Sequence, residues 1–148
     1  MKSFPAAPAP AAPIAEPFLW PVRVYYEDTD AAGVVYYANY LRFMERARTE
    51  WLRAMGFEQT ELAQSDGVAF VVRSAAIDYL APGRFDDELH VSVELIKVGA
   101  GQIEVIQRVL RGEDLLARAA VKVACVALRT MRPVRIPRSL ATRIRTTD

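Results

Sequence analysis

Two aspartates, Asp28 and Asp30, are the side chains whose type and spacing best suit chemistry in this sequence. They stand between a segment of alternating polarity and the longest amphipathic pattern of the chain, so Asp30 is expected on a loop before a helix. The unpaired backbone N–H groups of a helix N-terminus stabilise negative charge, including a carbonyl oxygen that becomes an oxyanion. A carboxylate nearby can attack the carbonyl carbon or activate water. These features make hydrolysis by acyl transfer chemically feasible.

The same segment also has a purely structural interpretation. Aspartate closes turns and caps helices routinely, and the spacing of Asp28 and Asp30 by itself favours neither role. Gly33 supplies backbone freedom there, or room for another group to approach the chain closely. The residues alone therefore leave catalysis and turn formation open.

Residue types exclude several other kinds of site. The single histidine, His90, falls within a strand pattern, and no Gly-x-Ser-x-Gly sequence is present, which argues against a Ser-His-Asp triad. One histidine and one cysteine are too few for a His/Cys metal cluster, so we expect no metal site. The single cysteine, Cys125, excludes an intrachain disulfide and is expected to be a small buried side chain. No glycine-rich phosphate loop of either common type is present.

The residues after the aspartates form the longest helical pattern. From about Asn39 to Met55, apolar residues recur with helical periodicity, and Gly56 is a natural helix stop. The apolar stripe contains Tyr40, Phe43, Met44, Ala47 and Trp51. A stripe this long needs a broad apolar surface to pack on, and a curved sheet provides one.

Strand patterns account for most of the remaining chain. A first strand is predicted at residues 20–28, with Val22, Val24 and Tyr26 on one face. A short helix and turn are predicted at residues 57–67, and further strands at 68–79, 89–95, 103–110 and 116–128. One strand, one long helix and four strands with short connections predict an α+β fold with an antiparallel sheet.

Length and composition are typical of one globular domain. The chain has 148 residues, a net charge of +1 and no apolar run long enough to span a bilayer, so we expect neither a nucleic-acid partner nor a transmembrane segment. Residues 1–19 are rich in proline and alanine and predict a disordered arm without a signal peptide, which leaves residues 20–148 as the domain. The arginine-rich residues 129–148 predict either a solvated tail or a clamp for anionic groups.

One long run of this sequence resembles the signature of a known family. Residues 25–40 read YYEDTDAAGVVYYANY, which closely resembles the signature of the hotdog-fold 4-hydroxybenzoyl-CoA thioesterase family. Residues 45–52 read ERARTEWL and resemble its Tol–Pal-associated acyl-CoA thioesterase branch. Later segments support the resemblance in the same order, at residues 70–73, 79–87 and 131–133. The resemblance covers roughly residues 20–145.

The resemblance implies a fold and a catalytic group. The fold is a hotdog: a five-stranded antiparallel sheet wrapped around one long central helix. The second aspartate of the family's Asp-x-Asp motif is its catalytic carboxylate, and that position is Asp30 here. The backbone N–H at the start of the central helix polarises the thioester carbonyl, which corresponds to Tyr37. The Tol–Pal branch usually carries histidine at the position of Tyr37, so the acyl preference of this chain is open.

The resemblance also implies substrate contacts. Gly33, Val34 and Arg73 are assigned to substrate binding. Basic residues near one turn meet the CoA phosphates in the aromatic-thioester branch, but the corresponding turn here is Gly99-Ala100-Gly101. Arg132 and Arg135 are candidates to take over this role.

The resemblance implies a cytoplasmic acyl-CoA thioesterase that acts on a short-chain or aromatic acyl group. The substrate is carried by CoA or by an acyl-carrier protein, and no further cofactor is expected. Two subunits pair their sheets edge to edge, with active sites at the interface, and such dimers often pair into tetramers. The alternative is a non-catalytic hotdog protein that binds acyl groups or acts as a scaffold in lipid or envelope metabolism. A dehydratase is disfavoured because it usually needs a histidine beside a carboxylate, and His90 is poorly placed for this.

Overall fold

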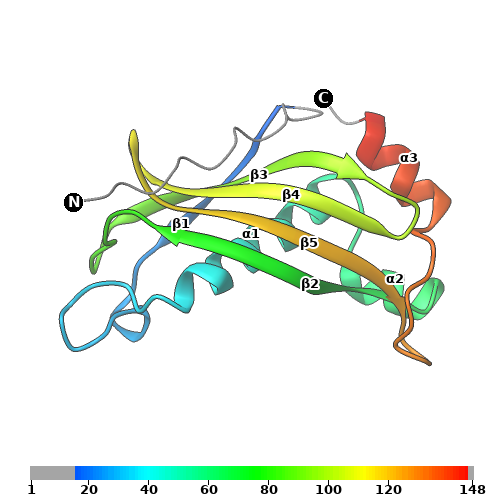
Figure 1. Cartoon of the computed structure of the whole chain (residues 1–148), viewed down its shortest axis with the longest axis horizontal. Coiled ribbons are helices and arrows are strands. Elements are labelled where there is room, and N and C mark those ends of the chain that lie inside the picture. The colour runs from blue at the N-terminus through cyan, green and yellow to red at the C-terminus, as the bar shows by residue number, and fades with distance from the viewer. Residues whose placement is uncertain (1–15, 147–148) are drawn as a thin grey trace, which may run out of the picture.

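The computed structural model describes residues 16–146 as an antiparallel sheet curved around a long helix (Figure 1). The strands are β1 (Phe18–Arg23), β2 (Val68–Tyr79), β3 (Glu88–Val98), β4 (Gln102–Arg111) and β5 (Asp114–Ala127). The helices are the 3-10 helix η1 (Tyr26–Asp28) and the α-helices α1 (Asn39–Ala54), α2 (Gln59–Ser65) and α3 (Arg138–Thr146). The strand order is β1-β3-β4-β5-β2 and each neighbouring pair is antiparallel, which confirms the predicted fold class.

Helix α1 forms where the sequence predicts it because its apolar residues share one face. It begins at Asn39, and Gly56 follows its end with φ of +91°, a conformation that glycine adopts freely. Phe43, Met44 and Ala47 have no exposed surface and belong to the core beneath the sheet. Full burial of a side chain such as Phe43 stabilises the fold by roughly 1.5–3 kcal/mol. The sheet thereby fixes the position of the helix and of its N-terminus.

The first strand is shorter than the sequence predicts. The prediction of a strand through residue 28 is wrong, because β1 ends earlier and η1 follows it. The chain turns here because a carboxylate oxygen of Asp28 accepts a 2.8 Å hydrogen bond from the backbone N–H of Tyr25, which competes with strand pairing. Tyr26 therefore does not continue the buried face of the strand: it is 75% exposed and stacks on Phe85.

The start of β1 includes two residues that the sequence assigns to the arm. Phe18 and Leu19 pair with Val93 and Ser92 of β3. Glu16 and Pro17 of the predicted arm are exposed and outside any regular element, and its residues 1–15 lie outside the described residues, as do 147–148.

The arginine-rich C-terminal segment packs on the core rather than forming a solvated tail. Ile136, Leu140 and Ile144 recur every four residues and are buried in the core cluster, which places one face of α3 against the fold. Arg138 and Arg145 lie on the exposed face of the same helix. Neither α3 nor any other helix within residues 16–146 has the length and apolar character needed to cross a bilayer.

A short strap at residues 132–136 ties α3 to the end of β5. The N–H of Val134 donates a 2.9 Å hydrogen bond to the carbonyl of Cys125. A Cβ at Gly101 would lie 2.8 Å from the carbonyl oxygen of Val134, so only glycine allows this close approach. The Cys125 thiol is buried as predicted, 3.8 Å from the carbonyl of Arg135, and burial raises its pKa.

Candidate active site

Asp30 lies in a tight turn between η1 and α1. Its Oδ1 accepts a 2.9 Å hydrogen bond from the N–H of Ala32, and its own N–H donates to the carbonyl of Val34 at 2.9 Å. Gly33 completes the turn with φ of +80°, where a side chain would be strained. Within residues 16–146 Oδ2 has no hydrogen-bond partner, and the side chain is exposed. One carboxylate oxygen of Asp30 is therefore available for chemistry.

Asp28 has a structural role instead. The residue is only 8% exposed, and its Oδ2 is occupied by the N–H of Tyr25 at 2.8 Å. Its carbonyl oxygen accepts hydrogen bonds from the N–H of Tyr36 at 2.8 Å and from the side-chain amide of Asn39 at 2.9 Å. The spacing of the two aspartates does not assign them different roles, but the structure does. Asp28 holds the turn against the start of α1, and Asp30 faces outward.

The approach to α1 contains a backbone donor without a partner. The N–H of Asn39 donates to the carbonyl of Tyr36 at 2.8 Å, but within the described part of the chain the N–H of Tyr37 donates to no protein atom. This N–H stands at the N-terminal end of α1, where the helix dipole favours negative charge. The ring of Tyr37 is 60% exposed and meets Tyr79 of β2 edge-on, with 5.9 Å between centroids.

Asp30 and the neighbouring tyrosines share one electrostatic environment. The pKa of Tyr36 is raised, first by its side-chain hydrogen bond with Tyr37 and the electrostatic interaction with that neighbour, then by desolvation, and least by the charge of Asp30. Asp30 therefore makes a small contribution to the electrostatic environment of Tyr36.

A second loop clamps the Asp30 loop from the other side. The carbonyl of Gly83 accepts a 2.8 Å hydrogen bond from the N–H of Val35, and Val34 forms an isolated antiparallel bridge with Arg84. The N–H of Gly83 donates to the buried hydroxyl of Tyr40 at 2.9 Å. A Cβ at Gly83 would meet a methyl carbon of Val35 at 3.0 Å, so glycine permits the close contact. The clamp couples the Asp30 loop to the first turn of α1.

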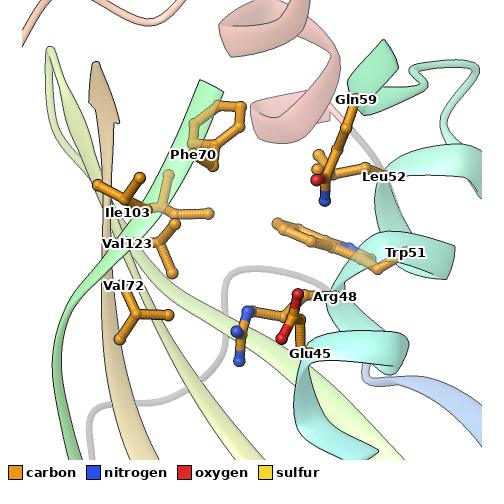
Figure 2. Close-up of a pocket in the computed structure, with 10 residues that line it drawn as sticks. Glu45, Arg48, Trp51, Leu52, Gln59, Phe70, Val72, Ile103 and Val123 are labelled. Carbon is orange, nitrogen blue, oxygen red and sulfur yellow. The ribbon is translucent and has the colours of Figure 1, made fainter. Parts of the chain in front are cut away.

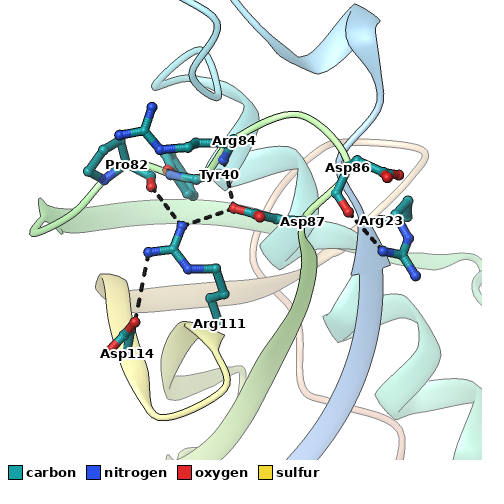
Figure 3. A network of polar contacts seen from close by, with 9 residues as sticks. Arg23, Tyr40, Pro82, Arg84, Asp86, Asp87, Arg111 and Asp114 are labelled. Atoms are coloured by element: carbon teal, nitrogen blue, oxygen red, sulfur yellow. Dashed lines mark hydrogen bonds and ion pairs between the residues drawn. The ribbon is translucent and has the colours of Figure 1, made fainter.

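An arginine–aspartate pair braces the clamping loop (Figure 3). Arg111 at the end of β4 donates to Oδ2 of Asp87 at 2.9 Å and to the carbonyl of Pro82 at 3.2 Å. The N–H of Arg84 donates to the same Asp87 oxygen at 2.9 Å. Desolvation acts to raise the pKa of Asp87, but the hydrogen bonds from Arg84 and Arg111 and the charges of these two residues together lower it. The ionised form of Asp87 therefore stabilises the loop that holds the candidate site.

Comparison with known proteins identifies the family. The family model described as the thioesterase-like superfamily matches residues 24–144. This chain belongs to that superfamily.

Curated relatives and solved structures agree with this membership. This chain is 50% identical over 123 residues to the acyl-CoA thioesterase YbgC of Haemophilus influenzae, covering 83% of this chain and 90% of the relative. It is 48% identical over 124 residues to the acyl-CoA thioester hydrolase YbgC of Escherichia coli O157:H7, covering 83% and 92%.

The fold is shared with structures of other thioesterases. A probable thioesterase from Bartonella henselae superposes with a TM-score of 0.79 and 36% identity, covering 82% of this chain and all of that one. Slr0204, a 1,4-dihydroxy-2-naphthoyl-CoA thioesterase from Synechocystis, gives a TM-score of 0.80 and 28% identity, covering 87% and 96%. The predicted family and hotdog fold are confirmed, and the shared name YbgC is consistent with the predicted branch.

The remaining residues assigned to substrate and CoA lie away from the Asp30 loop in this thioesterase chain. Arg73 stands at a bulge in β2 and donates to the side chain of Gln102 at 2.8 Å. Because the next residue, Ile103, faces the core, this contact lies on the opposite face of the sheet from α1. Arg132 and Arg135 lie in the segment after β5, whose end pairs with the start of β2. Tyr79, which contacts Tyr37 near the Asp30 loop, is at the other end of β2. Within a single chain, Gly33 and Val34 therefore lie beside Asp30, whereas the three arginines lie away from it.

Sequence reasoning missed the residues that hold the site in place. Tyr40 was assigned only to the core stripe, although its hydroxyl is the acceptor for Gly83. Asp87 and Arg111 were given no role, although they brace the loop. The one available signal was the segment at residues 79–87, whose proline, glycine and charged residues resemble the family pattern without indicating what they contact.

Proposed function

We propose that this protein hydrolyses the thioester of a short-chain or aromatic acyl-CoA, with Asp30 as the catalytic carboxylate. The observation that supports this most directly is the arrangement of one clamped loop. Among residues 16–146, a carboxylate oxygen of Asp30 in its turn and the N–H of Tyr37 at its end, before α1, have no hydrogen-bond partner. The relatives named as acyl-CoA thioesterases support CoA as the carrier, and an acyl-carrier protein remains the second candidate carrier.

The reaction follows from the carboxylate of Asp30 and the backbone N–H of Tyr37. The thioester carbonyl oxygen accepts a hydrogen bond from the Tyr37 N–H, and the helix dipole stabilises the negative charge that develops on it. Asp30 then acts in one of two ways. It attacks the carbonyl carbon, so that a C–O bond forms, the C–S bond breaks and water later cleaves the mixed anhydride. Alternatively it removes a proton from water, which attacks the carbon directly. CoA thiolate leaves in both routes, without a metal or a histidine.

We further propose that the working unit is a homodimer, or a tetramer of two dimers, in which β2 strands of two chains pair. β2 is the last strand of the sheet order, and its residues 74–76 are exposed. An exposed edge strand of this length is normally protected or paired. Pairing there would place the second chain beside Tyr79, whose ring contacts Tyr37, and would bring Arg73, Arg132 or Arg135 of the second chain toward the substrate. A cytoplasmic location fits an acyl-CoA substrate and a protein with one unpaired cysteine.

The test is a panel of short-chain, medium-chain and aromatic acyl-CoAs, with release of CoA followed by a thiol-reactive dye. We expect turnover by the wild-type protein and a loss of at least about a hundredfold in Asp30→Asn, since a positioned carboxylate contributes this much or more. Glu27→Gln, which neutralises an exposed acid in η1, is the matched control and is expected to retain activity.

Undiminished turnover in Asp30→Asn would remove the proposed mechanism. No thiol release from any acyl-CoA would contradict the proposed activity and favour a protein that binds acyl groups without cleaving them.

A further inference from the structure

A cavity of about 280 Å³ lies between α1 and the inner face of the sheet, on the side of β2 (Figure 2). This volume is just below the roughly 300–1,000 Å³ that small-molecule sites span. Most of its walls are apolar: Trp51, Leu52, Phe70, Val72, Ile103 and Val123. Two charged side chains of α1, Glu45 and Arg48, project toward the sheet into the same space. The cavity thus combines an apolar body with a polar end.

A buried side chain of β4 holds the guanidinium of Arg48 in place. It donates a 2.8 Å hydrogen bond to Oε1 of Gln107, a residue of β4 with no exposed surface. The amide nitrogen of Gln107 in turn donates to the carbonyls of Met44 at 3.0 Å and Ser92 at 3.3 Å. All hydrogen-bonding groups of the Gln107 side chain are therefore used, and the amide cannot turn without breaking several bonds. This support orients Arg48 before any ligand arrives.

Arg48 has N–H donors that could bind a ligand. A guanidinium carries five N–H donors, and within residues 16–146 Arg48 uses one, in the bond to Gln107. Its pKa is lowered by desolvation and raised by the charge of Glu45, yet no ion pair joins the two side chains in the described part of the chain. The arrangement leaves one cationic donor and one anionic acceptor side by side at the end of an apolar cavity.

We propose that this cavity receives the far end of the acyl group and selects an acyl group that carries a hydroxyl there. The hydroxyl oxygen accepts a hydrogen bond from Arg48, and the hydroxyl proton is donated to Glu45. The carbon chain lies against Trp51, Phe70 and Val72. This inference rests on the proposed function and extends its acyl range from short-chain and aromatic groups to chains long enough to reach Arg48.

The chemistry of the two charged groups decides between possible end groups. A hydroxyl is both donor and acceptor, so it satisfies Arg48 and Glu45 together. A methyl end displaces water from the remaining donors of Arg48 without replacing its hydrogen bonds, which costs binding energy, whereas Glu45 is exposed and keeps its water. A carboxylate end pairs with Arg48 but is repelled by Glu45. In one chain Arg48 lies nine residues after Asn39, about 13 Å along the helix axis from its start, so an extended chain is needed to reach it.

The experiment compares matched pairs of acyl-CoAs: hexanoyl, octanoyl and decanoyl, each with its terminally hydroxylated counterpart. We expect kcat/KM of the wild-type protein to favour the hydroxylated member of at least one pair by roughly tenfold to a hundredfold, as for a hydrogen bond to a charged group. Arg48→Met should abolish this preference by lowering kcat/KM for the hydroxylated member only. Glu45→Gln should weaken the preference and improve a carboxyl-ended analogue of the same length.

The matched control is Arg42→Met, which removes an exposed arginine from α1 outside this cavity and should leave the preference unchanged. A merely structural role for Arg48 would lower kcat/KM for both members of each pair equally, and that result overturns the inference. So does an equal rate for both members in the wild type, or a preference for the carboxyl end.

Binding of the free acids by calorimetry provides a readout that needs no catalysis. Tighter binding of terminally hydroxylated octanoic acid than of octanoic acid, lost in Arg48→Met, supports the cavity assignment even if no thioester is cleaved. Absence of thiol release from every acyl-CoA would contradict the proposed function instead. Equal binding of the two acids overturns the inference while leaving the proposed function intact.

Discussion

The hydroxyl of Tyr40 accepts a 2.9 Å hydrogen bond from the backbone N–H of Gly83, although the two residues are 43 positions apart. Gly83 also accepts from Val35 through its carbonyl, so one residue connects the first turn of α1 with the loop that carries Asp30. Tyr40 is buried, and desolvation raises its pKa. The position of the candidate carboxylate relative to the helix therefore depends on this contact.

Tyr40→Phe should destabilise the protein and slow hydrolysis. The substitution keeps the ring but leaves the buried N–H of Gly83 unpaired, which is expected to lower the free energy of unfolding by roughly 1–3 kcal/mol. Urea denaturation measures this loss. The change in kcat/KM measures how far the Asp30 loop, which Val35 ties to Gly83, depends on the bond. Tyr26→Phe is the control, because that side chain is 75% exposed and its stacking on Phe85 does not use the hydroxyl. Equal stability of wild type and Tyr40→Phe would show that the clamp does not depend on this bond.

Asp87 should contribute stability that depends on pH. Its folded-state pKa lies below the ordinary value of 3.8, so the ionised carboxylate stabilises the folded state above that value. This contribution is lost as the pH falls through the folded-state pKa. The difference in unfolding free energy between wild type and Asp87→Asn should be largest near neutral pH and shrink in acid. Asp114→Asn is the control, since its side chain also faces Arg111, at 3.8 Å, but is 73% exposed, so its pairing is expected to contribute little. A difference that grows in acid would contradict the assignment.

Substitution of Asp28 should mainly reduce stability, whereas substitution of Asp30 should mainly reduce catalysis. Asp28→Ala removes the acceptor for the N–H of Tyr25 and is expected to lower the free energy of unfolding by about 1 kcal/mol, as for other lost caps. Asp30→Asn keeps an oxygen for the N–H of Ala32, so its melting temperature should stay close to that of the wild type while hydrolysis is lost. Thermal unfolding of both variants beside their kcat values tests the division. A large loss of stability in Asp30→Asn would argue that the turn, rather than the chemistry, requires the acid.

Leu140 should show that α3 belongs to the core. The side chain is fully buried, and Leu140→Ala is expected to cost about 2–5 kcal/mol of unfolding free energy. Arg145→Ala on the exposed face of the same helix should change stability by less than about 0.5 kcal/mol. Denaturant titration compares the two. A similar small effect in both variants would mean that α3 adds little to the fold.

The sequence predicted those parts of the fold that depend on periodicity. α1 starts at the predicted Asn39, and β2 covers the predicted residues 68–79, because long apolar patterns dominate their local preferences. The turn at Tyr25 was missed because one carboxylate–backbone bond overrides an alternating pattern. α3 was missed because dense arginines concealed the spacing of Ile136, Leu140 and Ile144.

The candidate site was predictable only in part. The segment from Asp30 to Tyr37 is contiguous, so its pattern lies in one stretch of sequence. The contacts that position it do not: Arg111 and Asp87 are 24 residues apart, and Tyr40 and Gly83 are 43 apart. No local pattern indicates which residues of β4 and of the clamping loop will meet. The same is true of Arg48 and Gln107, which lie 59 positions apart.

The burial of Cys125 has a practical consequence. Because this is the only cysteine in the chain and its thiol is enclosed between β5 and the strap, a colourless protein background is expected when liberated CoA is titrated with a dye. Slow labelling of Cys125 itself would then measure the rate at which the strap separates from the sheet in the native state.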